Sequence, residues 1–154
     1  MRSLAAFEIN NINYLENLGL KHAEIHFTLN IIKKAMFDAN KSIKNLLKES
    51  GLHDFDNQEF GMDHKVFIDT HLLTFLCDIT SETSLYRAGS RGDERMWFGA
   101  DIFPLVQPDD IYSIFVFNQQ LYAVNITRLN IADCPECTLD NPIKTIVNSI
   151  KATI

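Results

Sequence analysis

The most distinctive stretch of the sequence, residues 85–98, contains arginines at intervals of four residues: Arg87, Arg91 and Arg95. Ser90 and Asp93 lie between them. Guanidinium groups donate paired hydrogen bonds to guanine edges or to phosphates, and a Ser or Asp oxygen accepts one from a cytosine amine. The residues alone favour the alternative, an exposed loop whose Arg, Asp and Glu side chains pair with one another. Arg95 could also stack on Trp97 within the scaffold.

A second cationic stretch lies between residues 33 and 48. Five lysines occupy it beside a single acidic residue: Lys33, Lys34, Lys41, Lys44 and Lys48. Just before a predicted short helix come four polar residues: Asp38, Asn40, Lys41 and Ser42. Their side chains can cap that helix, or they can contact phosphates and base edges. Both interpretations stay open, and under the second one these residues join the arginine stretch as candidate DNA contacts.

A metal-dependent nuclease is the enzyme to consider first. Such a site needs a carboxylate at one strand end and, on the neighbouring strand, a second carboxylate two residues before a lysine. Asp101 could be the first acid, but residues 123–128 offer Asn and Thr where the second acid and the lysine are required. Cys134 and Cys137 form a CxxC pair without the second pair that a zinc site needs. We therefore expect a chain that is not an enzyme and holds neither metal nor cofactor.

The bulk composition fits a single domain over residues 1–154. Of these residues 46% are hydrophobic and 22% charged, and no run of about 18 apolar residues could span a membrane. Three cysteines do not make an even disulfide framework, so we expect a reducing compartment, the cytoplasm. The formal net charge of −6 disfavours non-specific nucleic-acid binding. Because cations are concentrated in two stretches, one face could still contact a duplex.

The elements that must position these residues are mostly strands. Alternation and β-branched residues predict strands or hairpins at residues 23–29, 65–77, 82–98 and 111–127. The last is the clearest, with two apolar runs joined by a three-residue polar turn at residues 118–120. Helices are predicted at residues 42–51 and from Asn141, an N-cap that precedes Pro142. The chain is thus expected to be an α+β domain.

A resemblance to a known family is carried by the run SIKNLLKESGLHDFDNQEFG and, further along, by SLYRAGSRGDERMWFGADIFPLVQPDDIYSIFVFNQQLYAVNIT. The chain resembles the B3-like DNA-recognition domains of restriction systems, such as the EcoRII effector domain and the specificity domain of McrB-like LlaJI subunits. The resemblance extends from about Phe37 to Thr127. It implies an antiparallel pseudobarrel of about seven strands with flanking short helices, which grips the DNA major groove between two arms. By position, these arms would lie near residues 38–42 and 87–95.

The resemblance also implies partners and a biological role. The partners would be double-stranded DNA, an AAA+ GTPase motor domain in the same chain and a McrC-like nuclease subunit, with no membrane. Catalysis would lie elsewhere, and a chain that stops at Ile154 would be the N-terminal part of a longer protein. We expect a sequence-specific target-recognition domain of a restriction system, active in phage defence. Two alternatives remain: a protein-interaction domain that uses the apolar hairpin and the terminal helix, and a small metal-dependent nuclease.

Overall fold

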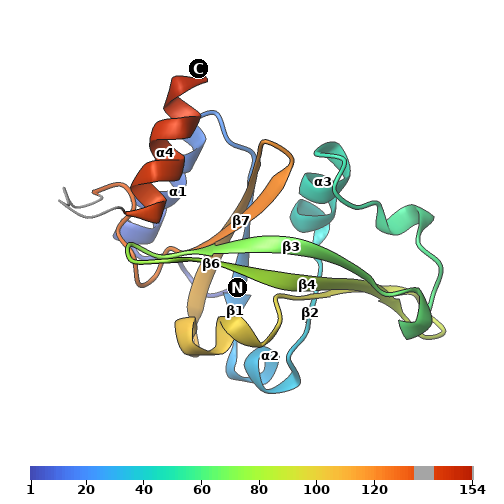
Figure 1. Cartoon of the computed structure of the whole chain (residues 1–154). Helices are drawn as coiled ribbons and strands as arrows, with labels where there is room; N and C mark the ends of the chain where they lie inside the picture. Colours follow the sequence, from blue (N-terminus) through green and yellow to red (C-terminus); the bar gives the residue numbers. More distant parts are fainter. Residues whose placement is uncertain (134–140, 154) are drawn as a thin grey trace.

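The computed structural model describes residues 1–133 and 141–153 and shows an α+β fold (Figure 1). The helices in these residues are α1 (Ala6–Asn17), α2 (Leu29–Lys34), α3 (Lys41–Glu49) and α4 (Pro142–Ala152). The strands are β1 (His22–Phe27), β2 (Phe37–Asp38), β3 (Val66–Leu73), β4 (Asp78–Ala88), β5 (Asp93–Trp97), β6 (Asp110–Phe117) and β7 (Gln120–Asn125). Short 3-10 helices lie at η1 (Phe55–Asn57), η2 (Met62–His64) and η3 (Ala100–Leu105). None of the described helices is long and apolar enough to cross a membrane.

The strands form one seven-stranded sheet in the order β1-β6-β7-β3-β4-β5-β2, which curls into a half-barrel (Figure 1). Neighbouring strands are antiparallel except β3 and β7, which run parallel with Thr70 opposite Leu121. The seven strands agree with the expected pseudobarrel, but the sheet is mixed where an antiparallel one was expected. β3 and β7 are not joined by a hairpin, and the chain from β4 to β6 supplies the long connection that a parallel pair requires.

The inner face of the sheet carries the larger core. Side chains alternate between the two faces of each strand, so every second residue points inward. The buried inward residues include Ile25, Leu72, Leu85 and Met96. α3 packs against them through Ile43, Leu46 and Leu47, which lie on one side of the helix because they are three and four residues apart. The helix predicted at residues 42–51 is thus confirmed as α3.

The outer face of β6 and β7 carries a second core. α1 and α4 cover it, and it includes Phe115 and Val124. The apolar face of α4 is buried here as the sequence predicts, through Ile143, Val147 and Ile150. Within the described residues, no part of β4, β5 or β2 belongs to this core. The helices α1 and α4 therefore cover one half of the outer face of the sheet and not the other.

α1 is the main element that the sequence pattern did not reveal. Two of its positions that face the protein interior are polar, because Glu8 and Asn11 are fully buried. The Asn11 Nδ2 donates to the carbonyl oxygens of Ile126 and Leu129 at 3.0 and 2.9 Å. A side-chain amide thus takes the place of an apolar contact. Without apolar residues at these positions, the helical period of residues 6–17 is obscured.

The clearest predicted hairpin is confirmed as β6 and β7, but its turn is shorter than expected. Phe117 pairs with Gln120, so only Asn118 and Gln119 lie in the turn. Both have positive φ angles, 50° and 62°. This conformation gives the turn the right-handed backbone twist that the strands of a two-residue hairpin require. The predicted three-residue turn is therefore wrong by one residue, because Gln120 already belongs to the ladder.

Candidate nucleic-acid interface

The two cationic segments that the sequence singles out lie side by side at one edge of the sheet. β2 pairs with β5, so that Asp38 lies opposite Arg95. The Ala39 amide continues the contact by donating to the Glu94 carbonyl oxygen at 2.9 Å. Because the two strands are antiparallel, the chain after Ala39 runs towards the tip of the β4–β5 hairpin. The two predicted arms are therefore joined through the backbone pairing of β2 with β5.

The tip of the β4–β5 hairpin presents its polar side chains to solvent. Gly89 and Gly92 have φ angles of 41° and 71°, which non-glycine residues adopt only at a cost. Ser90 is exposed, and the side chain of Arg91 is 83% exposed. The Arg91 Nη2 lies 3.4 Å from the Asp93 carboxylate, a distance and an exposure that make the pair weak. Arg91 can therefore release Asp93 and reach an external ligand.

Arg87, by contrast, is used inside the hairpin. Its Nε donates to the Gly92 carbonyl oxygen at 2.9 Å, and its Nη1 donates to the Phe55 carbonyl oxygen at 3.3 Å. The guanidinium carbon lies 4.5 Å from the centroid of the Phe60 ring. Only 18% of the Arg87 side chain is exposed. These contacts hold the hairpin against the loop that contains η1, so an external ligand could reach only Nη2, which faces Glu94 at 3.9 Å.

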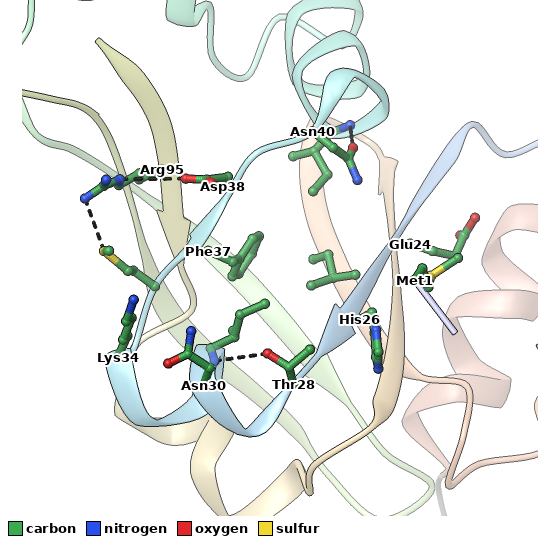
Figure 2. A pocket seen from close by; sticks show the side chains of 14 residues that line it. Met1, Glu24, His26, Thr28, Asn30, Lys34, Phe37, Asp38, Asn40 and Arg95 are labelled. Carbon is green, nitrogen blue, oxygen red and sulfur yellow. Dashed lines mark hydrogen bonds and ion pairs between the residues drawn. The ribbon is translucent and has the colours of Figure 1, made fainter. Parts of the chain in front are cut away.

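Arg95 lies on β5 opposite Asp38 of β2, at the edge of the sheet (Figure 2). Its Nε is 3.7 Å from the Asp38 carboxylate and its Nη2 is 3.8 Å from the Asp93 carboxylate. The Nε atom is buried, and no described residue forms a hydrogen bond with it. Tyr86, its neighbour across the ladder, donates its hydroxyl to the Met36 sulfur at 3.4 Å. The predicted stacking of Arg95 on Trp97 is not among the contacts of the described residues.

Asn40 and its neighbours begin α3. The Asn40 Oδ1 accepts a hydrogen bond from the Ile43 amide at 3.0 Å, so the capping interpretation of this residue is confirmed. Lys41 and Ser42 are exposed in the first turn of the helix. The ammonium group of Lys41 has no hydrogen-bond or ion-pair partner within residues 1–133 and 141–153. These two side chains are thus available to a ligand.

Lys44 joins α3 to the hairpin. Its ammonium lies 3.2 Å from the Glu94 carboxylate on β5. Burial acts to raise the pKa of Glu94, but the hydrogen bond from its own backbone amide, together with Lys44 and Arg87, outweighs burial and holds that pKa below its usual value. Glu94 therefore stays ionised and links the two segments.

Three further basic residues lie near these segments, and none of them is among the predicted site residues. Lys33 and Lys34 are exposed at the end of α2, which leads into β2. Lys65 lies with its ammonium 4.9 Å from the centroid of the Tyr86 ring on the outer face. The lysines of α2 were visible as part of the cationic stretch. Nothing in the sequence indicated that Lys65 lies beside Tyr86, because the β3–β4 ladder brings the two residues together.

The residues of the alternative functions have other roles in the fold. Asn125 donates to the buried Asp110 at 2.8 Å, and the Thr127 hydroxyl donates to Glu8 at 2.6 Å. Asp101 is exposed in η3. The apolar faces of the β6–β7 hairpin and of α4, which a protein-interaction domain would have used, are buried in the two cores. The possible zinc ligands at positions 134 and 137 lie outside the described residues.

Comparison with known proteins gives no match for this chain. No family model matches it, and no curated protein or solved structure is significantly similar.

Proposed function

We propose that this chain is a sequence-specific double-stranded DNA-binding domain, the B3-like target-recognition module of a restriction system. In this proposal Arg91 and Ser90 of the hairpin tip contact DNA together with Lys41 and Ser42 of α3. The observation that carries it is the pairing of β2 with β5, which brings two polar segments nearly 60 residues apart in the sequence to one edge of the sheet. Exposed guanidinium and ammonium groups beside hydroxyl groups are typical of surfaces that bind phosphates and base edges.

The remaining candidate residues have supporting roles in this proposal. Arg87 and Asn40 hold the hairpin and α3 in place through the hydrogen bonds described above. Asp38, Asp93 and Arg95 form a charged group in which each carboxylate lies within 4 Å of the Arg95 guanidinium. When DNA binds, the carboxylates can exchange these weak pairs for hydrogen bonds from cytosine amines.

Catalysis belongs to other domains or subunits in this proposal. An AAA+ GTPase motor and a McrC-like nuclease would use the bound domain as their guide to a DNA site in the cytoplasm. The edge of the sheet formed by β2 and β5, where the two cationic segments lie, is called the cationic edge. The net charge of −6 is consistent with such a role if DNA binds only at this edge. Binding to random DNA should then be weak, and specific contacts should supply most of the affinity.

The test begins with a selection of duplexes from a random pool, followed by titration of the enriched site. Wild-type protein should enrich one sequence. Arg91→Ala should weaken binding to that site by about 1–3 kcal/mol if the guanidinium contacts a base. Lys41→Gln should weaken binding to all duplexes and reduce the slope of log K against log salt by about 0.9 if it contacts one phosphate.

A matched control is Lys21→Gln, which removes an exposed lysine that pairs with Glu49, remote from β2 and β5. It should bind the enriched site as tightly as the wild type does. The proposal is wrong if no sequence is enriched, or if the double variant Lys41→Gln, Arg91→Ala keeps wild-type affinity and the wild-type salt slope.

A further inference from the structure

The half-barrel is open between its two terminal strands, and a cavity lies in this opening. β1 pairs only with β6 and β2 pairs only with β5, so each strand has one edge without a strand partner in the described residues. A cavity of about 460 Å³ lies between them, and it is lined by β1, α2, β2, the start of α3, Arg95 and Met1 (Figure 2). We call this cavity the edge slot.

The floor of the edge slot is apolar and belongs to the larger core. Ile25, Phe37 and Ile43 line the slot, although each is at most 5% exposed. Ile31 of α2 adds a partly buried side chain. An apolar floor of this kind favours a ligand with an apolar or aromatic body.

The ends of the edge slot decide between an extended peptide and a compact ligand. α2 closes one end through Thr28, Asn30 and Lys34, and the first turn of α3 closes the other (Figure 2). An added strand would have to continue past both helices, because a β-strand advances more than 3 Å per residue. The volume lies within the range of about 300–1,000 Å³ that is typical of small-molecule sites. The slot therefore suits a compact ligand.

The rim of the edge slot offers both donors and acceptors. The Nε of Arg95 is buried without a hydrogen-bond partner, and the Nδ2 of Asn40 has no partner in the described residues. On the acceptor side, Glu24 uses its Oε2 for His22 and Ser113, while its Oε1 has no partner among these residues. The side-chain amide of Asn30 can both donate and accept hydrogen bonds. A purely apolar ligand would leave these groups unsatisfied.

The charges of the rim nearly balance. Lys34 and Arg95 lie around the same cavity as the carboxylates of Glu24 and Asp38. Met1 and His26 also line it, and the His26 ring is hydrogen-bonded to Asp109 outside the lining at 2.8 Å. A highly charged anion would meet both carboxylates, and a cation would meet both basic groups. An uncharged ligand avoids either repulsion.

We propose that the edge slot binds an uncharged planar heterocycle whose edge carries both donors and acceptors, of the size of a nucleobase or nucleoside. The heterocycle lies on the floor formed by Ile25, Phe37 and Ile43. Its edge hydrogen-bonds with Asn30, Asn40 and the Arg95 Nε. The site shares Asp38, Asn40 and Arg95 with the DNA-binding surface proposed above. It needs neither Arg91 nor Lys41, and it stands if that surface does not bind DNA.

The experiment is calorimetric titration of the whole chain with adenosine, guanosine, cytidine and thymidine, and with their 5′-monophosphates. At least one nucleoside should bind saturably at one site, and its monophosphate should bind more weakly. Ile31→Trp, which fills the slot from α2, should lower that affinity at least tenfold. Asn30→Ala, which removes an exposed amide without other contacts in the described residues, should lower it about three- to tenfold.

Thermal melting and a second probe complete the test. Lys21→Gln should bind nucleosides as the wild type does, and the melting temperatures of both slot variants identify any variant that fails to fold. A duplex that carries 2-aminopurine opposite an abasic position distinguishes the two sources of the heterocycle. Enhanced fluorescence with wild type, lost in Ile31→Trp, would assign an extruded base, whereas nucleoside binding without this change would assign a free nucleoside. The proposal is overturned if no nucleoside and no 2-aminopurine duplex engages the slot, or if Ile31→Trp and Asn30→Ala bind as the wild type does.

Discussion

Glu8 is a carboxylate that the fold holds in its ionised form. Arg2 donates to both of its oxygens at 2.8 and 2.6 Å, and Thr127 and the Ala5 amide add further hydrogen bonds at 2.6 and 2.7 Å. These hydrogen bonds, of which that of Arg2 is the strongest influence, outweigh burial and lower the pKa of Glu8 to about 2. The group thus joins α1 to the end of β7 by a network that depends on charge.

We predict that Glu8 makes the stability of the domain depend on pH in the acid range. Because its pKa is lower in the folded chain than in the unfolded one, its contribution is fully present above about pH 4.5 and is lost as the pH falls towards 2. The full contribution is roughly 3 kcal/mol. Urea unfolding of the wild type and of Glu8→Gln, measured from pH 2 to pH 7, checks this.

The variant should be less stable than the wild type at pH 7, and the two should converge near pH 2. Glu49→Gln is the control, because Glu49 is exposed and pairs only with Lys21, so it should change the stability by less than about 1 kcal/mol. A difference between Glu8→Gln and the wild type that is equal at pH 2 and pH 7 would contradict the assignment.

Single residues also show where sequence reasoning reaches its limit. The exposure of Arg91 follows from its place between two glycines, and the cap formed by Asn40 follows from its place before an amphipathic run. The role of Arg87 could not be predicted, because its partners are backbone carbonyls of Gly92 and of the distant Phe55. Only the tertiary fold decides whether an arginine in a loop points outward or holds the loop together.

At the scale of elements, the loop of residues 55–64 packs against the β4–β5 hairpin and is hydrogen-bonded to it. The Gly61 amide donates to the Arg87 carbonyl oxygen at 2.7 Å, and the Gln58 amide group donates to the Leu85 carbonyl oxygen at 2.9 Å. The Phe60 ring lies directly over Gly92, where an added Cβ would collide with it. The hairpin is therefore held at its base and at its turn.

We predict that Gly92→Ala destabilises the domain more than Gly89→Ala does. Both changes place a side chain at a positive φ angle, which costs about 1–2 kcal/mol. Only at Gly92 does the new methyl group also displace the Phe60 ring, since the space around Gly89 is open to at least 4 Å. Chemical denaturation of both variants measures the two losses.

A double-mutant cycle identifies the cause of the difference. In the background Phe60→Ala, the additional loss caused by Gly92→Ala should disappear, leaving the loss seen at Gly89. An additional loss that persists without the ring would show that Phe60 does not fix the hairpin.

The elements found by sequence reasoning share one property, and those missed share another. α3, α4 and the β6–β7 hairpin have apolar residues at most of their buried positions, so their period is visible in the sequence. α1 has polar residues at buried positions, and β2 is only two residues long. β2 forms because it pairs with β5, and no local sequence pattern predicts that pairing. The same contact forms the centre of the candidate interface, so this part of the site could not be predicted.

At the scale of the whole molecule, the sheet separates two cores. Ala123 belongs to the inner core and the next residue, Val124, belongs to the outer one. α3 packs only on the first core, while α1 and α4 pack only on the second. The two sets of helices are therefore stabilised by contacts on opposite faces of the same strands.

We predict that small cavities in the two cores have additive effects. Ile43→Val on α3 and Ile150→Val on α4 remove one methylene-sized group from buried sites, and each should cost about 0.5–1.5 kcal/mol. The double variant should lose the sum within about 0.5 kcal/mol, because the side chains share no contact. Denaturation of the single and double variants checks this, and a coupling above about 1 kcal/mol would mean that the cores form one cooperative packing unit.

The order of strands in the sheet bears on how the chain reaches its native state. β3, β4 and β5 follow one another as hairpins, as do β6 and β7, so these pairs can form from neighbouring residues. Three other strand pairs join residues about 50 or more positions apart in the sequence: β1–β6, β2–β5 and β3–β7. Bringing such distant segments together costs conformational entropy, so we expect the chain to refold in milliseconds to seconds. The β2–β5 pair at the cationic edge is one of these distant pairs. The candidate interface is therefore complete only after β2 and β5 have come together in the folding chain.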